Sequence, residues 1–125
     1  MANFDRKTQD RSLRWISKQF KTAEILKQDF DGFAVMGISG AIMGALIARK
    51  MNKKLVVVRK ENDGSHSDYK VENIEAGDKL IFLDDLVASG KTYKRVRDGV
   101  NFHGGKILSI ILYYSERVKN CEYYD

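Results

Sequence analysis

The chain has 125 residues and a mass of 14.3 kDa, which is enough for one domain with one hydrophobic core, spanning residues 1–125, but not for two. Hydrophobic residues make up 43% and charged residues 31% of it, a composition that excludes a disordered chain and a membrane protein. The formal net charge of +5 is a moderate excess that suits a phosphate-bearing partner, small or polymeric.

Cysteine and histidine are scarce. The single cysteine, Cys121, excludes an internal disulfide and a cysteine-based metal site, and the two histidines, His66 and His103, are too few for a histidine-rich one. No apolar stretch approaches the ~18–20 residues that span a bilayer, and the first residues are charged, unlike a secretory signal. We therefore expect a cytoplasmic protein without a membrane partner.

Residues 1–29 have the pattern of a basic amphipathic helix, which we expect Thr8 or Asp10 to cap. Apolar residues recur there at spacings of three and four, namely Leu13, Ile16, Phe20, Ala23 and Leu26. Seven basic and four acidic residues give this segment +3 of the net +5. The simpler interpretation is a solvated face of a helix that covers a sheet. A nucleic-acid-binding module is the alternative, but only Trp15 offers a stacking ring among these charges, so we do not expect a nucleic-acid partner.

Short apolar runs then alternate with helical segments. We expect buried strands at residues 33–36, 55–58, 80–83 and 107–114. One helix is expected over residues 41–51, with Ser39 as its cap, Asn52 past its end, and a small-residue face of Gly44, Ala45 and Ala48. A second helix is expected from the Ser89–Thr92 turn to about Phe102, closed by Gly104 and Gly105. Residues 60–70 are expected to form a loop and residues 115–125 a tail. This order predicts an α/β fold, with a three-layer parallel sheet and helices on both faces.

The turn from Asp84 to Thr92 has the most distinctive chemistry in the chain. Two acidic residues follow four apolar ones, and Ser89-Gly90-Lys91-Thr92 then opens a helix. Backbone N–H groups of such a turn and of a helix N-terminus bind phosphate. The carboxylates of Asp84 and Asp85 can accept hydrogen bonds from sugar hydroxyls or hold Mg²⁺, directly or through water. The sequence therefore predicts a sugar phosphate lying across this turn.

The spacing of the glycines does not fit either of two better-known phosphate-binding motifs, the P-loop and the dinucleotide fingerprint. Gly90-Lys91-Thr92 matches the end of a P-loop, but Asp85 occupies the position of the required earlier glycine. Gly37-Ile38-Ser39-Gly40 fails the dinucleotide fingerprint, because Ser39 stands where the second glycine should be. An ATPase and a dinucleotide-binding protein are therefore not expected.

The string at residues 80–92, LIFLDDLVASGKT, resembles the PRPP-binding motif of the type I phosphoribosyltransferase family, where PRPP is 5-phosphoribosyl 1-diphosphate. The resemblance covers residues 33–114 and implies that family's Rossmann-like fold. The family transfers the phosphoribosyl group from PRPP to a nucleobase, of purine or orotate type, with Mg²⁺ and release of pyrophosphate. It also implies a homodimer.

The resemblance further implies roles for particular residues. Lys60, Asp84 and Asp85 would be catalytic, with the two aspartates contacting the ribose and Mg²⁺. The 5′-phosphate would be held by Ala88, Ser89, Gly90, Lys91 and Thr92. The pyrophosphate would be held by Gly37, Ile38, Ser39 and Gly40, with Lys60 and, more weakly, Arg59. His66 lies in the loop that would close over the site, although an exposed loop histidine is an equally good interpretation.

The chain also departs from the family pattern. Ala88 replaces an acidic residue that some purine-salvage members carry, and little sequence is left for the hood that recognises the base. Tyr113, Tyr114, Tyr123 and Tyr124 are candidates for stacking on a base, with packing under the C-terminal tail as the alternative for each. The small hood motivates a second hypothesis, a regulatory protein that binds PRPP or a nucleotide without turnover.

Overall fold

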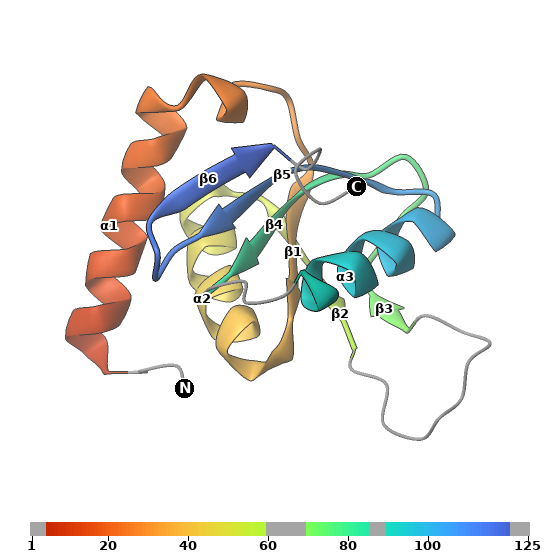
Figure 1. Cartoon of the computed structure of the whole chain (residues 1–125), viewed down its shortest axis with the longest axis horizontal. Coiled ribbons are helices and arrows are strands. Elements are labelled where there is room, and N and C mark those ends of the chain that lie inside the picture. Colours follow the sequence, from red (N-terminus) through yellow and green to blue (C-terminus); the bar gives the residue numbers. More distant parts are fainter. Residues whose placement is uncertain (1–4, 60–69, 86–89, 121–125) are drawn as a thin grey trace.

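The computed structural model describes residues 5–59, 70–85 and 90–120. Helices and strands alternate along this part of the chain, with a short 3₁₀ helix, η1, after the first helix (Figure 1). In order, they are α1 (Arg6–Thr22), η1 (Glu24–Leu26), β1 (Gly32–Met36), α2 (Gly37–Met51), β2 (Lys54–Val58), β3 (Val71–Glu72), β4 (Lys79–Asp84), α3 (Lys91–Phe102), β5 (Lys106–Leu112) and β6 (Arg117–Asn120). None of the helices in the described ranges is long and apolar enough to cross a membrane.

The strands form one sheet in the order β3-β2-β1-β4-β5-β6. The four predicted strands, β2, β1, β4 and β5, are parallel, as expected. Two antiparallel edge strands were not predicted: β3 pairs with β2, and β6 pairs with β5. The first is only two residues long and the second is mostly polar. Neither therefore has the apolar periodicity by which a strand is predicted from sequence, and both depend on backbone pairing with the neighbouring strand.

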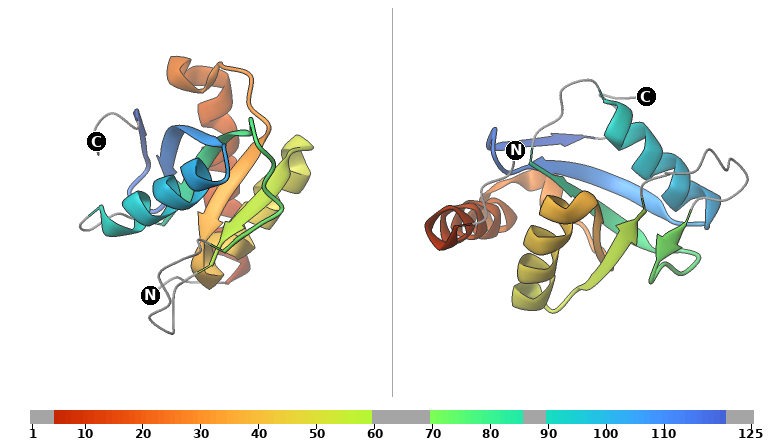
Figure 2. Two further views of the ribbon diagram at one scale, coloured as in Figure 1. Left: turned by 90° about the vertical axis from the view of Figure 1, so that its right-hand side faces the viewer. Right: turned by 90° about the horizontal axis from the view of Figure 1, so that it is seen from below.

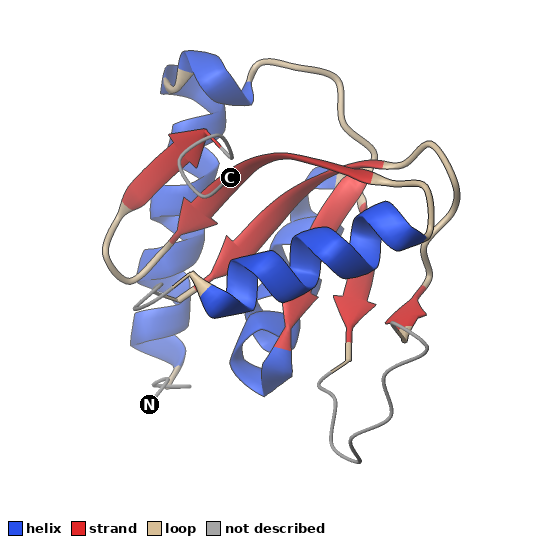
Figure 3. Cartoon of the chain, turned by 45° about the vertical axis from the view of Figure 1, so that its right-hand side comes forward, coloured by secondary structure: helices blue, strands red, loops and turns tan. Residues whose placement is uncertain are grey.

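Helices cover both faces of this sheet, which confirms the three-layer α/β fold. Alternate strand residues point to opposite faces. Phe33 and Val35 of β1 pack in the cluster that holds α1, η1 and α2, whereas Ala34 packs in the cluster under α3. Figures 2 and 3 show α3 alone across its face of the sheet, with α1 and α2 on the other.

Helix α1 is shorter than the predicted segment and has a different cap. It begins after Asp5, whose side chain accepts a 2.9 Å hydrogen bond from the backbone N–H of Thr8. The expectation of Thr8 or Asp10 as the cap was therefore wrong. The apolar stripe is confirmed: Ile16 and Leu26 are buried, and the other predicted positions pack half-buried against the same cluster.

Helix α2 begins at Gly37, directly after β1 and four residues earlier than expected. Ser39 therefore lies inside the helix and is not its cap. The residue at the N-cap position is Met36, which makes no side-chain capping bond, and Gly37 adopts a φ of 85° that favours glycine. At the other end Asn52 is left-handed, with φ 55°, and closes the helix as predicted.

The small-residue face of α2 is confirmed at Gly44 and Ala48, which are buried, but was wrong at Ala45, which is exposed. A Cβ atom on Gly44 would lie 2.7 Å from both Leu55 Cδ1 and Val35 Cγ1. We expect Gly44→Ala to lower the melting temperature, because overpacking costs about 1–3 kcal/mol and outweighs the ~1 kcal/mol that alanine gains over glycine in a helix. A rise in melting temperature by calorimetry would show that α2 has room to move off the sheet.

A buried ion pair joins β2 to the turn before β4. Lys54 Nζ lies 2.6 Å from Asp78 Oδ2 and 3.3 Å from Glu75 Oε1, and Asp78 is 8% exposed. Desolvation by itself lowers the pKa of Lys54, but the hydrogen bonds to Asp78 and Glu75 outweigh it and raise the pKa above the ordinary 10.5. Because the folded-state pKa exceeds the unfolded one, this stabilisation is complete below pH 10.5 and is lost as the pH rises through the folded-state pKa.

We expect Lys54→Met to lower the free energy of unfolding by about 1–3 kcal/mol near neutral pH, since Asp78 is left as a buried carboxylate without its cation. Urea denaturation measures this, with the exposed Lys50→Met as the matched control. The difference between Lys54→Met and wild type should shrink as the pH rises above the pKa of Lys54. A difference that stays constant there would mean that the ammonium charge is not its cause.

Candidate functional site

The sheet topology brings the two predicted phosphate turns to one place. From β1 the chain crosses through α2 to β2 on one side, while β4 lies on the other side of β1 and leads through α3 to β5. Strand order therefore reverses between β1 and β4, and ligands of such sheets bind outside the carboxyl ends of the strands at that point. Gly37–Gly40 follows β1 there, and Asp84 and Asp85 end β4.

The two acidic residues are held by the sheet. Asp84 is buried, and its Oδ1 accepts a 2.9 Å hydrogen bond from the backbone N–H of Asp85. The carbonyl oxygens of Asp84 and Asp85 accept 3.0 Å bonds from the N–H groups of Tyr113 and Tyr114. Backbone pairing with the β5 side thus continues past the end of β4. These bonds fix the backbone of Asp84 and Asp85, and with it the position of the two carboxylates.

The first turn of α2 lies tightly against these strand ends. A Cβ atom on Gly40 would lie 3.3 Å from Val35 Cβ and 3.8 Å from the carbonyl oxygen of Leu83, the residue before Asp84. The N-cap residue of α2 makes no side-chain capping bond, and the backbone N–H groups and dipole of a helix N-terminus favour an anion. The glycine at position 40 thereby lets a helix N-terminus approach the acidic pair.

A second helix N-terminus follows β4. Gly90 is buried in the left-handed conformation, with φ 79°, at the N-cap position of α3, and no side-chain capping bond is made there. Lys91 is exposed and Thr92 half-buried in the first turn. Ala88 and Ser89 lie outside the described residues, as do Lys60 and His66 in the predicted loop.

Arg59 directly follows β2 and is exposed. Its Nη1 lies 3.4 Å from Glu72 Oε2 on the edge strand β3, and both side chains are about 60% exposed. Such exposed pairs contribute little to stability, so the contact can be exchanged for another at small cost. The contact matches the simpler interpretation of Arg59 as a surface charge at a strand end, and its role toward pyrophosphate stays a prediction.

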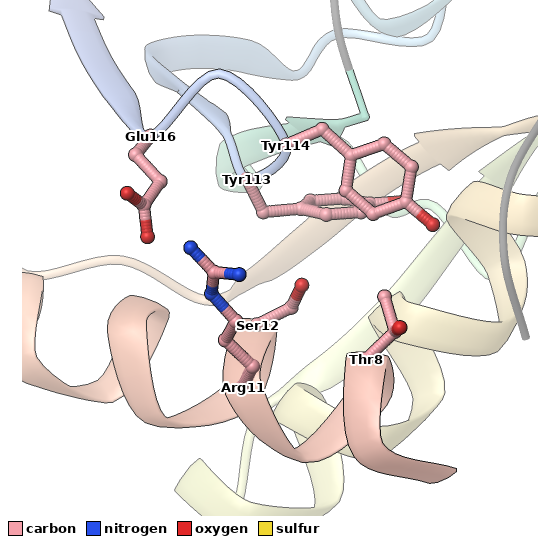
Figure 4. Close-up of a pocket in the computed structure, with 6 residues that line it drawn as sticks. All are labelled: Thr8, Arg11, Ser12, Tyr113, Tyr114 and Glu116. Atoms are coloured by element: carbon pink, nitrogen blue, oxygen red, sulfur yellow. The ribbon is translucent and has the colours of Figure 1, made fainter. Parts of the chain in front are cut away.

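A cavity of about 140 Å³ lies between α1 and the end of β5 (Figure 4). It is lined by Thr8, Arg11, Ser12, Tyr113, Tyr114 and Glu116. The two tyrosine rings meet edge to face, 5.4 Å apart. Tyr113 packs in the core cluster under α1 and also lines the cavity, and stacking of either ring on a base stays a prediction.

Sequence reasoning did not single out Arg11, Ser12 or Glu116. A signal for Ser12 was present: Thr8, Ser12, Ile16 and Phe20 recur every four residues, so the buried stripe of α1 continues in polar residues toward its N-terminus. Glu116 carried no such signal, because its approach to α1 depends on the β5–β6 turn.

The chain is similar to known nucleobase-processing enzymes. Adenine phosphoribosyltransferase of Petrotoga mobilis is 30% identical over 107 residues, 73% of this chain and 62% of that enzyme. Orotate phosphoribosyltransferase of Pyrococcus horikoshii is 26% identical over 84% of this chain and 58% of its own length. Among solved structures, adenine phosphoribosyltransferase of Thermoanaerobacter pseudethanolicus superimposes with a TM-score of 0.67, over 86% of this chain and 68% of its own, at 24% identity.

No protein-family model matches the chain. The matched region spans less than two thirds of the length of the two sequence relatives. On its motif, its fold and these relatives, the chain is similar to the type I phosphoribosyltransferases and has their fold.

Proposed function

We propose that this protein transfers the 5-phosphoribosyl group from PRPP to a nucleobase and releases pyrophosphate. The observation that carries the proposal is that the end of β4, which bears Asp84 and Asp85, lies beside the first turn of α2 at the switch point of the sheet. One side of this site offers carboxylate acceptors and the other offers helix N–H donors. A ligand with both sugar hydroxyls and phosphate groups satisfies both sides.

Each part of PRPP has candidate partners in this arrangement. We assign the ribose hydroxyls to the carboxylates of Asp84 and Asp85. The 5′-phosphate is assigned to the turn and helix start at residues 88–92, where Gly90 gives the backbone its left-handed turn. The pyrophosphate is assigned to the first turn of α2 at residues 37–40, together with Lys60 and, secondarily, Arg59.

The donor set fits a magnesium ion that arrives with its substrate. Among residues 5–59, 70–85 and 90–120, no group of three or more acidic, histidine or cysteine residues forms a complete metal cage. Mg²⁺ is commonly held by one or two carboxylates and by oxygens of a bound phosphate ligand. Asp84 and Asp85 would supply the protein's share, and the bound ion would neutralise charge on the pyrophosphate as it leaves.

The reaction needs positioning and charge stabilisation more than covalent catalysis. As the bond from the anomeric carbon to pyrophosphate lengthens, positive charge develops on the ribose ring and negative charge on the leaving group. The carboxylates at the end of β4 face the first charge, and the N-terminus of α2 faces the second. Because both elements are anchored to the sheet, little reorganisation is needed when these charges appear.

We also propose that the protein is a homodimer that pairs through the outer face of α2. Ile38 is 76% exposed and Leu46 38% exposed, and half-buried Ile42 lies between them at helical spacing. An apolar stripe facing solvent on a helix without acidic residues is typical of a contact surface. Sedimentation velocity of the wild-type chain and of Leu46→Lys tests this assignment.

Calorimetry with PRPP, with and without Mg²⁺, tests the proposed function first. We expect saturable binding only with Mg²⁺, and then pyrophosphate release with at least one base of a purine and pyrimidine panel. Absence of PRPP binding would overturn the proposal. Tight PRPP binding without pyrophosphate release on any base would instead favour the regulatory hypothesis.

A further inference from the structure

We propose that the cavity between α1 and the end of β5 binds the acceptor, and that this acceptor is a neutral nucleobase and not an anionic one such as orotate. The cavity adjoins the proposed ribose site through two backbone hydrogen bonds, from Tyr113 to Asp84 and from Tyr114 to Asp85. The identity of the acceptor rests on the proposed function, but binding of a free base to the cavity does not.

The wall formed by α1 is polar where a core helix would be apolar. Ile16 and Phe20 pack into the core, and one and two turns before Ile16 the same stripe presents Ser12 and Thr8 to the cavity. Ser12 is only 5% exposed. A buried hydroxyl normally has a hydrogen-bond partner, so its position in a cavity wall points to a ligand.

Two other hydroxyl groups of α1 donate hydrogen bonds to backbone carbonyl oxygens of the helix, and Ser12 does not. Ser17 Oγ donates to the carbonyl oxygen of Leu13 at 2.7 Å, and Thr22 Oγ1 donates to that of Lys18 at 3.1 Å. The Ser12 hydroxyl makes no hydrogen bond with any described residue, although the same kind of backbone acceptor lies one turn before it. It therefore keeps both its donor and its acceptor capacity for the cavity.

The opposite wall suits a flat ring. Tyr113 and Tyr114 stand nearly perpendicular, at 85°, so one presents a face where the other presents an edge. Figure 4 shows both rings on the side of the cavity opposite Thr8 and Ser12. A planar heterocycle fits between ring surfaces on one side and hydroxyls on the other, where its edge nitrogens and oxygens find partners.

The charged side chains of the cavity lining are balanced, so they offer an anion no excess positive charge. Arg11 and Glu116 point toward one another across the mouth of the cavity (Figure 4), so their formal charges cancel. Glu116 has a φ of 55° in the β5–β6 turn, an uncommon conformation for a residue other than glycine. Its carboxylate is an acceptor for ring N–H or amino groups, and it offsets the attraction that Arg11 by itself would exert on a ligand carboxylate. A neutral base that carries N–H donors matches this mouth better than orotate does.

Binding of free bases to the ¹⁵N-labelled full chain tests the inference without PRPP. We expect adenine and hypoxanthine to shift the amide resonances of Thr8, Ser12, Tyr113 and Tyr114, and orotate to bind more weakly. Ser12→Ala should weaken adenine binding roughly threefold to tenfold, the value of one hydrogen bond. Ser17→Ala, whose hydroxyl bonds within the helix, is the matched control and should leave binding unchanged.

Glu116→Gln should raise the affinity for orotate about tenfold, because it removes the opposing charge, with PRPP affinity unchanged. Tighter binding of orotate than of adenine to the wild type, base-induced shifts confined to other residues, or equal effects of Ser12→Ala and Ser17→Ala would each overturn the inference. Adenine binding in the cavity without any PRPP binding would overturn the proposed reaction and leave the base site standing. PRPP binding without any adenine binding in the cavity would overturn the base site alone.

Discussion

Replacing Asp85 by asparagine is expected to weaken Mg²⁺-dependent PRPP binding by about 10- to 100-fold. A hydrogen bond to a charged group contributes ~1.5–3 kcal/mol, and each ~1.4 kcal/mol is a factor of ten in affinity. Asparagine keeps the size of the side chain, and the backbone of residue 85 remains bonded to the N–H of Tyr114. The change therefore removes charge and metal-binding capacity without a change of shape. Titration calorimetry at fixed Mg²⁺ concentration measures the loss.

Asp98→Asn is the matched control for that experiment. Asp98 lies in α3, where its carboxylate pairs locally with Arg97 at 3.3 Å, so the same loss of charge should leave PRPP affinity unchanged. Unchanged affinity in Asp85→Asn would count against its assignment to the ribose and Mg²⁺. Equal losses in both variants would indicate a general effect of net charge, with no specific contact at the end of β4.

Replacing Ile16 by alanine is expected to lower the free energy of unfolding by about 2–5 kcal/mol, the usual cost of truncating a buried large aliphatic side chain. Ile16 is fully buried and packs in the cluster that joins α1 to the sheet. Urea denaturation followed by circular dichroism measures the effect. Ile16→Val, which removes one methylene group, should cost only about 0.5–1.5 kcal/mol.

The exposed Lys18→Ala serves as the control on the same helix, and we expect it to have almost no effect on stability. If Ile16→Ala cost as little as Lys18→Ala, the packing of α1 on the sheet would be wrong. The cavity wall at Thr8 and Ser12 would then be wrong as well, because both residues belong to that helix. The stability measurement is thus also an independent test of the proposed base site.

Local signals predicted most elements of the core. Strands β1 and β4 are short apolar runs buried on both faces, and such runs are visible in a sequence. The cap of α1 was misplaced because Asp5, Thr8 and Asp10 all suit an N-cap, and only the chain path selects Asp5. The start of α2 was misplaced because Gly37 and Gly40 suggest a turn, whereas packing against Val35 and the β4 strand continues the helix through them.

By itself, the sequence determined the alternating α/β order, the apolar stripe of α1 and the phosphate-type turn after β4, because each depends on residues close together in the chain. The tertiary structure decided which strands are neighbours, and hence that Asp84 and Asp85 meet the turn at residues 37–40. It also decided that Thr8 and Ser12 face Tyr113, about a hundred residues away. Contacts at such separations depend on sheet order and helix packing, and no periodicity within one segment encodes them.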